Sequence, residues 1–190
     1  CGFFVIADQL KSDTAQAIAQ LKDMGITPVM VTGDHPLSAH AIARQAGIDE
    51  VIAKVLPQEK GEVVKRFQKE HKVAMVGDGI NDAVALTQAD VGIAIGSGSD
   101  VAVESADIIL MKDSIVDVAT AIRLSKAVIR NIHQNLFWAF FYNSIGIPIA
   151  AGVLYAFGGP LLSPVFAGAA MAFSSVCVVT NALRLRRFKA

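Results

Sequence analysis

The stretch Met75-Val76-Gly77-Asp78-Gly79-Ile80-Asn81-Asp82 decides the fold, because it joins an apolar, strand-like run to a helix-like segment. A carboxylate at the carboxyl end of a parallel strand faces the crevice in which open α/β sheets bind ligands. Glycines on either side of it let the backbone approach a ligand closely. The carboxylates of Asp78 and Asp82 are close in the sequence and repel each other unless a cation lies between them. Mg²⁺ prefers such oxygen ligands. A tight turn with side-chain hydrogen bonds would explain the same residues, so both interpretations stay open here.

Short apolar runs alternate with amphipathic segments on both sides of this stretch. Helical spacing of apolar residues, with Gly25 and Gly47 as the ends of the first two helices, predicts helices over residues 13–24, 36–46, 58–70 and 81–89. The apolar runs predict strands over residues 3–7, 27–32, 50–55, 72–76, 91–95 and 107–111. This alternation indicates a Rossmann-type α/β fold, with a parallel sheet covered by helices on both faces.

Charge divides the sequence sharply at Arg130. No Asp, Glu, Lys or Arg occurs between Arg130 and Arg184. All seventeen acidic residues precede Arg130, against thirteen basic residues up to that point, which gives the first part a net charge of −4. The zero net charge of the chain is therefore an average of two unlike parts, and no basic patch indicates a nucleic-acid partner.

Two uncharged runs of 23 residues, 135–157 and 161–183, follow a helical segment over residues 115–130. As a helix, each run would be about 34 Å long, enough to cross a bilayer core of about 30 Å. Basic residues flank both outer ends, and the positive-inside rule then puts both ends in the cytoplasm. We expect a transmembrane helical hairpin with its connection at residues 158–160; two buried helices of a globular core are the alternative.

Three polar groups stand at or just beyond predicted strand ends: Thr32-Gly33-Asp34, Lys60, and the residues from Asp78 to Asp82. A hydroxyl, an ammonium group and a metal-binding carboxylate are what a phosphoryl group needs around it. Each feature alone has a simpler explanation, since a helical lysine is usually solvated and Thr-Gly-Asp can be an ordinary strand exit. Their combination in this order favours a phosphoryl site with Mg²⁺.

These motifs resemble the phosphorylation domain of a P-type ATPase, which has the haloacid-dehalogenase-like fold. The resemblance rests on Thr32-Gly-Asp34, Pro57-x-x-Lys60 and Gly77-Asp-Gly-Ile-Asn-Asp82. It continues through residues 89–96 and 107–110, and into the uncharged part at residues 131–136, 142–143, 148 and 171–175. That part is similar to the heavy-metal branch of the family, and to its copper(I) exporters in particular.

The resemblance implies a role for each matching residue of the acidic stretch. Asp78 would hold the catalytic Mg²⁺, and Asn81 and Asp82 would support the phosphoryl group and the metal. Lys60 would neutralise the aspartyl phosphate.

The Thr-Gly-Asp motif has implied roles of its own. Thr32 and Gly33 would contact the phosphoryl oxygens, and Asp34 would lie near the nucleotide, ATP. Asp8 resembles the hinge position at which the nucleotide domain rejoins the phosphorylation domain.

The chain also departs from the family pattern. It has no Asp-Lys-Thr-Gly-Thr motif, which carries the phosphorylated Asp, no nucleotide-binding or actuator domain and no Cys-Pro-Cys span. We therefore expect the last quarter of a longer pump, inactive by itself. Its expected parts are the C-terminal part of the phosphorylation domain (1–114), a connecting helix (115–134), and the last two spans with a short basic tail (135–190).

Four residues of the uncharged runs are candidate Cu(I) ligands: Tyr142, Asn143, Met171 and Ser175. Polar residues at mid-span are costly unless they face the bundle interior or a pathway. Met171 and Ser175 are four apart and share a helix face, and a thioether suits Cu(I). From the residues alone, packing is the favoured explanation of Met171 and Ser175, and only the resemblance implies that they are ligands. Cys177 lies off that face, so we do not include it.

The sequence therefore predicts an ATP-driven Cu(I) export pump of a bacterial inner membrane, with ATP, the lipid bilayer and a cytosolic copper chaperone as partners. Pumps for Zn, Cd or Ag, and a non-catalytic fragment that binds or regulates a full pump, are alternatives. No Asp or Glu follows Asp117, which argues against Zn²⁺ because a divalent ion gains from carboxylates. A membrane-tethered phosphatase would need a second Asp two residues after Asp8, and Leu10 stands there.

Overall fold

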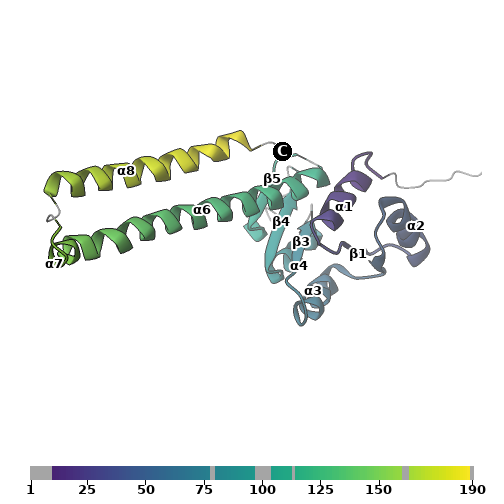
Figure 1. The fold of residues 1–190 in the computed structure, drawn as a ribbon. Coiled ribbons are helices and arrows are strands. Elements are labelled where there is room, and N and C mark those ends of the chain that lie inside the picture. Colours follow the sequence, from purple (N-terminus) through teal and green to yellow (C-terminus); the bar gives the residue numbers. More distant parts are fainter. Residues whose placement is uncertain (1–9, 78–79, 97–103, 113, 160–162, 189–190) are drawn as a thin grey trace, which may run out of the picture. The chain divides into compact units, whose positions relative to one another are not determined.

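The computed structural model describes residues 10–77, 80–96, 104–112, 114–159 and 163–188. The chain divides into two compact units, residues 1–120 and 121–190. The first unit is α/β and the second is helical (Figure 1).

Two parallel sheets form the first unit. In the first sheet, β1 (Val29–Val31) pairs with β2 (Glu50–Ile52), with Val29 opposite Glu50. In the second sheet, β4 (Val91–Ile95) lies between β3 (Ala74–Gly77) and β5 (Ile108–Leu110). All pairs are parallel, as the alternation of strands and helices predicts, but the described strands form two ladders and not one. The predicted strand at residues 3–7 lies outside the described residues.

The helices of this unit begin and end close to the predicted positions. They are α1 (Thr14–Asp23), α2 (Pro36–Ala46), α3 (Lys60–Gln68) and α4 (Ala83–Gln88). Two of them are preceded by a short 3-10 turn, η1 (Pro57–Glu59) before α3 and η2 (Ile80–Asp82) before α4. Gly47 ends α2 in the left-handed conformation with φ of 78°, which a residue with a Cβ adopts only at a cost.

The core of the second sheet is centred on Leu86 of α4 and Ala94 of β4, both with no exposed surface. Met75 and Ala106 pack against this pair. A Cβ on Gly92 would lie 2.6 Å from the carbonyl oxygen of Leu86, so α4 approaches β4 more closely than any other residue at position 92 would allow. This contact fixes α4, and with it the acidic turn η2, against the sheet.

The second unit consists of two long helices that run side by side (Figure 1). α6 (Ile115–Ala150) has its first turns in the first unit, where Val118 and Ala119 are buried, and α8 (Pro164–Leu183) ends in the 3-10 turn η3 (Arg184–Arg187). A short helix, α7 (Val153–Ala156), lies between them.

The helix boundaries of this unit differ from those predicted. α6 runs through residues 130–135 without a break and stops at Ala150, seven residues before the end of the first uncharged run. Gly152, two residues after this end, has a φ of 89°. This left-handed conformation interrupts a right-handed helix, which explains why α6 does not continue. Within the described residues, no helix combines the length and the apolar character that crossing a membrane requires.

Candidate functional site

Thr32, Gly33 and Asp34 form a compact turn at the carboxyl end of β1. The Thr32 hydroxyl donates to Oδ2 of Asp34 at 2.8 Å and accepts from the Asp34 backbone N–H at 3.1 Å. Thr32 is half-buried, whereas Gly33 and Asp34 are exposed. The turn therefore presents a hydroxyl and a carboxylate to solvent at the edge of the sheet where α/β folds bind ligands.

The segment after β2 carries this turn to the lysine motif. Backbone N–H groups of Lys54 and Val55 donate to the carbonyls of Asp34 and Thr32, each at 3.1 Å. Lys54 has φ of 57°, the one non-glycine residue with positive φ among those the structure describes. Such a conformation is uncommon and costs free energy, and nothing in the sequence indicates it. It directs the chain into Pro57 and η1, from which Lys60 begins α3.

Lys60 and Asp82 form the central ion pair of the site. Nζ of Lys60 lies 2.6 Å from Oδ1 of Asp82, and their side chains are 15% and 11% exposed. The two residues come from α3 and from η2, 22 positions apart in the chain. Removing one partner of such a half-buried pair would leave the other charge partly desolvated.

Gly77 makes room for this pair. A Cβ at position 77 would lie 2.7 Å from both Cβ and Oδ2 of Asp82, closer than real Cβ atoms come to other atoms. The last residue of β3 is therefore a glycine because the Asp82 carboxylate occupies the space where a side chain would be. The sequence motif had been explained by ligand access alone; the structure adds this steric reason.

Of the two predicted Mg²⁺ ligands, Asp78 and Asp82, the structure describes Asp82. Asp78 and Gly79 lie outside the described residues, as does Asp8, and Asn81 is exposed in η2. Among the residues that the structure describes, no three His, Cys, Asp or Glu side chains form a metal-binding group. Asp82 supplies a carboxylate, the kind of oxygen ligand that Mg²⁺ prefers. The donor chemistry therefore fits Mg²⁺, with one described carboxylate.

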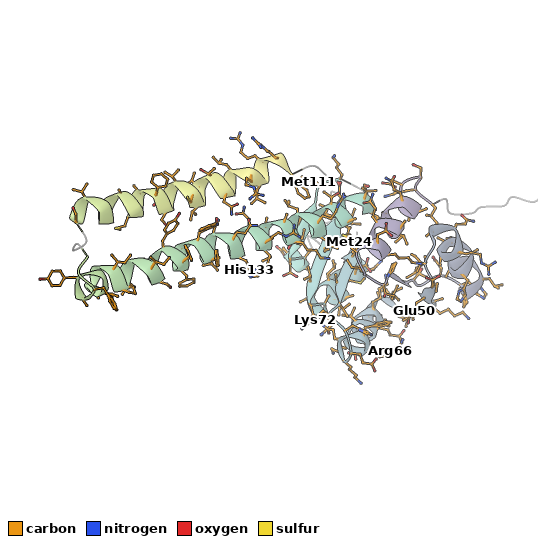
Figure 2. All side chains as sticks on the ribbon, viewed as in Figure 1. Met24, Glu50, Arg66, Lys72, Met111 and His133 are labelled. Atoms are coloured by element: carbon orange, nitrogen blue, oxygen red, sulfur yellow. The ribbon has the colours of Figure 1, made fainter. Side chains whose placement is uncertain are left out.

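A second acidic residue, Asp90, organises the start of the second sheet, and sequence reasoning gave it no role. Lys72, labelled in Figure 2, donates to Asp90 at 2.7 Å, and the Val73 N–H and Gln68 donate at 3.0 and 3.2 Å. The hydrogen bond from Lys72, followed by those from Val73 and Gln68, lowers the pKa of Asp90 from 3.8 to about 2. The same hydrogen bond raises the pKa of Lys72. Asp90 thus ties α3 and α4 to the entry of β3 and β4.

The candidate Cu(I) ligands do not meet within the second unit. The Tyr142 hydroxyl lies 3.9 Å from Sγ of Cys177, whereas Asn143 donates within its own helix to the Ala139 carbonyl at 2.8 Å. Ser175 likewise donates to the Met171 carbonyl at 3.3 Å, and Met171 is 75% exposed. Of the four, Tyr142 alone has a side-chain partner on the other helix. That partner is Cys177, which spacing relative to Met171 had excluded.

Three asparagines join the two helices near one end of the pair, and the sequence analysis did not single them out. Asn131 donates to the backbone carbonyl of Asn181 at 2.8 Å, and Asn181 donates to Asn135 at 2.9 Å. Asn135 donates in turn to Asn131 at 3.2 Å, and Arg184 donates to Asn181 at 3.1 Å. Asn131 is 8% exposed. Asn131 and Asn135 are four residues apart on α6 and so share one helix face, which was the signal that could have found these two.

Comparisons with known proteins find the same type of α/β unit in a family of hydrolases and relatives among the P-type ATPases. A family model described as haloacid dehalogenase-like hydrolase matches residues 1–90. Copper-transporting ATPase 1 of Rhizobium meliloti (strain 1021) is 59% identical over 182 residues, which are 95% of this chain and 22% of that protein. This chain is homologous to part of the P-type ATPases. The Copper-exporting P-type ATPase of Vibrio cholerae serotype O1 is also 59% identical, over 97% of this chain and 20% of that protein.

A solved P-type ATPase shares the fold of this chain. The crystal structure of a zinc-transporting PIB-type ATPase in the E2.Pi state matches 94% of this chain and 28% of that chain, with a TM-score of 0.83 and 38% identity. The predicted resemblance to this family and the haloacid-dehalogenase-like fold of the first unit are confirmed. The chain spans about a fifth of the length of the curated P-type ATPase relatives just named.

Proposed function

We propose that this chain forms part of an ATP-driven pump that exports Cu(I) through an aspartyl-phosphate intermediate. The half-buried Lys60–Asp82 pair beside Gly77 is the observation that carries the proposal, because it places a cation and a carboxylate at the carboxyl end of a parallel strand. The phosphorylated Asp, the nucleotide domain, the actuator domain and the Cys-Pro-Cys span would be supplied by the rest of the polypeptide.

Within this proposal, the predicted site residues of the first unit surround the phosphoryl group. Thr32 and the Gly33 backbone bind its oxygens, with Asp34 nearer the nucleotide. Lys60 neutralises its charge while Asp82 holds the ammonium group at 2.6 Å. Asn81 supports the same group.

Asp78 and Asp82 would hold Mg²⁺, which neutralises phosphate oxygens when bound. In the complete polypeptide, Asp78→Asn should abolish phosphoenzyme formation from ATP, since an amide lacks the charge to hold the metal. Acid-stable labelling with radioactive ATP measures this. Labelling at the wild-type level would refute the assigned role of Asp78.

We propose that the second unit is a transmembrane hairpin of a bacterial inner membrane, with both ends in the cytoplasm. The support is the sequence, in which two runs of 23 uncharged residues have basic residues at their outer ends. Reporter fusions at Gly159 and at Ala190 test this arrangement. The hairpin predicts opposite sides of the membrane for the two fusions, and finding both on one side would contradict it.

Cu(I) is the proposed substrate, with Ag(I) as a surrogate. The 59% identity to copper-transporting relatives, against 38% to the zinc-transporting structure, supports copper. The absence of any Asp or Glu after Asp117 also favours a monovalent, soft ion. Tyr142, Asn143, Met171 and Ser175 are the proposed ligands, and thiolates of the Cys-Pro-Cys span would complete the set. A cytosolic copper chaperone is the proposed donor of the ion.

A further inference from the structure

A hollow lined by arginines lies at the end of the α6–α8 helix pair where the three asparagines meet. Its volume is about 210 Å³. Arg130 of α6 and both Arg184 and Arg187 of η3 line it, and we call it the arginine pocket. Gln134 adds an amide, and Leu185 and Phe188 add apolar surface. The pocket lies entirely within the second unit.

The charges of this pocket have no anionic counterpart in the second unit. No Asp or Glu follows Asp117, so residues 121–190 contain no carboxylate side chain. None of the ion pairs found among the described residues involves Arg130, Arg184 or Arg187. Three like charges around one hollow repel each other, and an anion inside it would relieve that repulsion.

The asparagine network holds one of these arginines in place. Arg184 donates through Nη1 to Oδ1 of Asn181. The side-chain amide of Asn181 donates to Asn135, and its backbone carbonyl accepts a hydrogen bond from Asn131. A guanidinium group has five N–H donors, and the hydrogen bond from Arg184 uses one of them. Planar guanidinium groups bind phosphate through two parallel hydrogen bonds, which a single ammonium group does not reproduce.

We propose that the arginine pocket binds the phosphate headgroup of an anionic phospholipid. The argument for a lipid is the position of the pocket, because α6 and α8 lead from it directly into the two uncharged runs. Basic pockets between helices at the cytoplasmic side of a membrane suit anionic headgroups, and Leu185 and Phe188 suit the adjoining glycerol and acyl part. The inference rests on the proposed membrane hairpin.

Lipid retention by the complete polypeptide tests this proposal. The protein is purified in neutral detergent doped with phosphatidylglycerol or phosphatidylcholine, and bound lipid is counted by native mass spectrometry. Phosphatidylglycerol should be retained and phosphatidylcholine should not. Arg187→Gln should weaken retention about tenfold, and Arg187→Lys by less, because charge is kept while the paired hydrogen bonds are lost.

Arg186→Gln is the matched control, since Arg186 belongs to the same turn but does not line the pocket. It should change retention by less than about twofold, because its guanidinium group does not line the pocket. Equal losses in Arg186→Gln and Arg187→Gln would overturn the pocket in favour of diffuse charge attraction. Full displacement of the lipid by free glycerol 3-phosphate would overturn the lipid as the ligand. The readout is independent of ATP hydrolysis, so loss of retention with intact Cu(I)-stimulated turnover separates this inference from the proposed pump.

Discussion

The two units hold their polar groups in opposite ways. In the first unit, charge meets charge: Lys60 pairs with Asp82 and Lys72 pairs with Asp90, at the ends of short parallel strands. In the second unit, the polar contacts between the helices are neutral, through the amides of Asn131, Asn135 and Asn181 and the Tyr142–Cys177 contact. Contacts of the first kind suit phosphate and a hard divalent ion. Among the contacts of the second kind, the sulfur of Cys177 is the soft donor that Cu(I) prefers.

The largest effect that this contrast predicts is the loss of phosphoenzyme formation when Lys60 is replaced. In the complete polypeptide, Lys60→Met should lower phosphoenzyme formation from ATP by about a hundredfold or more, because a charge that stabilises the phosphoryl group is lost and Asp82 is left unpaired. Rapid-quench labelling with ATP measures the rate.

Lys65→Met on the same helix is the control for that variant. Lys65 forms an exposed ion pair with Glu62, with side chains 52% and 71% exposed. Exposed pairs of this kind contribute less than about 1 kcal/mol, so labelling should stay within about twofold of wild type. Equal losses in the two variants would mean that helix charge in general, and not the Lys60–Asp82 pair, supports the reaction.

A smaller effect is expected at Gly77. Gly77→Ala should destabilise the first unit by about 1–3 kcal/mol, since the new methyl group forces Asp82 to move. Urea unfolding measures the change. Gly61→Ala is the control, because its Cβ would meet Cγ1 of the exposed Val84 side chain at 3.0 Å, where there is space to adjust, and alanine favours the helix. A Gly77→Ala variant as stable as wild type would show that Asp82 does not need the space.

The smallest effect concerns the pKa of Asp90. A carboxyl titration followed by NMR should give a midpoint of about 2, and Lys72→Met should return it toward 3.8. Because the folded-state pKa is the lower one, the stability contributed by Asp90 is present above about pH 4 and is lost as pH falls toward 2. A wild-type midpoint near 3.8 would show that the hydrogen bonds from Lys72 and Val73 do not form in solution.

The same contrast explains how much of the molecule the sequence could predict. Helix α2 was predicted at its observed bounds because Pro36 and Gly47 act locally. The family resemblance predicted that Lys60 and Asp82 serve the same phosphoryl site, but their direct contact and the steric need for Gly77 depend on packing. The positive φ of Lys54 could not be predicted, because a lysine is not a residue type that indicates this conformation.

In the second unit, spacing along a single helix was a poor guide to contacts. Met171 and Ser175 share a helix face, as predicted, but Ser175 bonds its own helix and Met171 is exposed. Cys177 and Asn181, four residues apart, both contact α6 instead. Which face of α8 meets its partner depends on both helices, and the part of the helix pair between Arg130 and Arg184, which is uncharged all round, gives little amphipathic signal.

Met171→Ala in the complete polypeptide tests the central claim most directly, namely that the two units divide phosphoryl chemistry from the binding of a soft ion. Two rates are compared in the same preparation: ATP hydrolysis stimulated by Cu(I) or Zn²⁺, and phosphorylation by inorganic phosphate. We predict that Cu(I) stimulates the wild type more than Zn²⁺ does, and that Met171→Ala depresses the Cu(I) response while phosphorylation by phosphate stays largely intact. Stimulation by Zn²⁺ equal to that by Cu(I), or an unchanged Cu(I) affinity in Met171→Ala, would contradict the account.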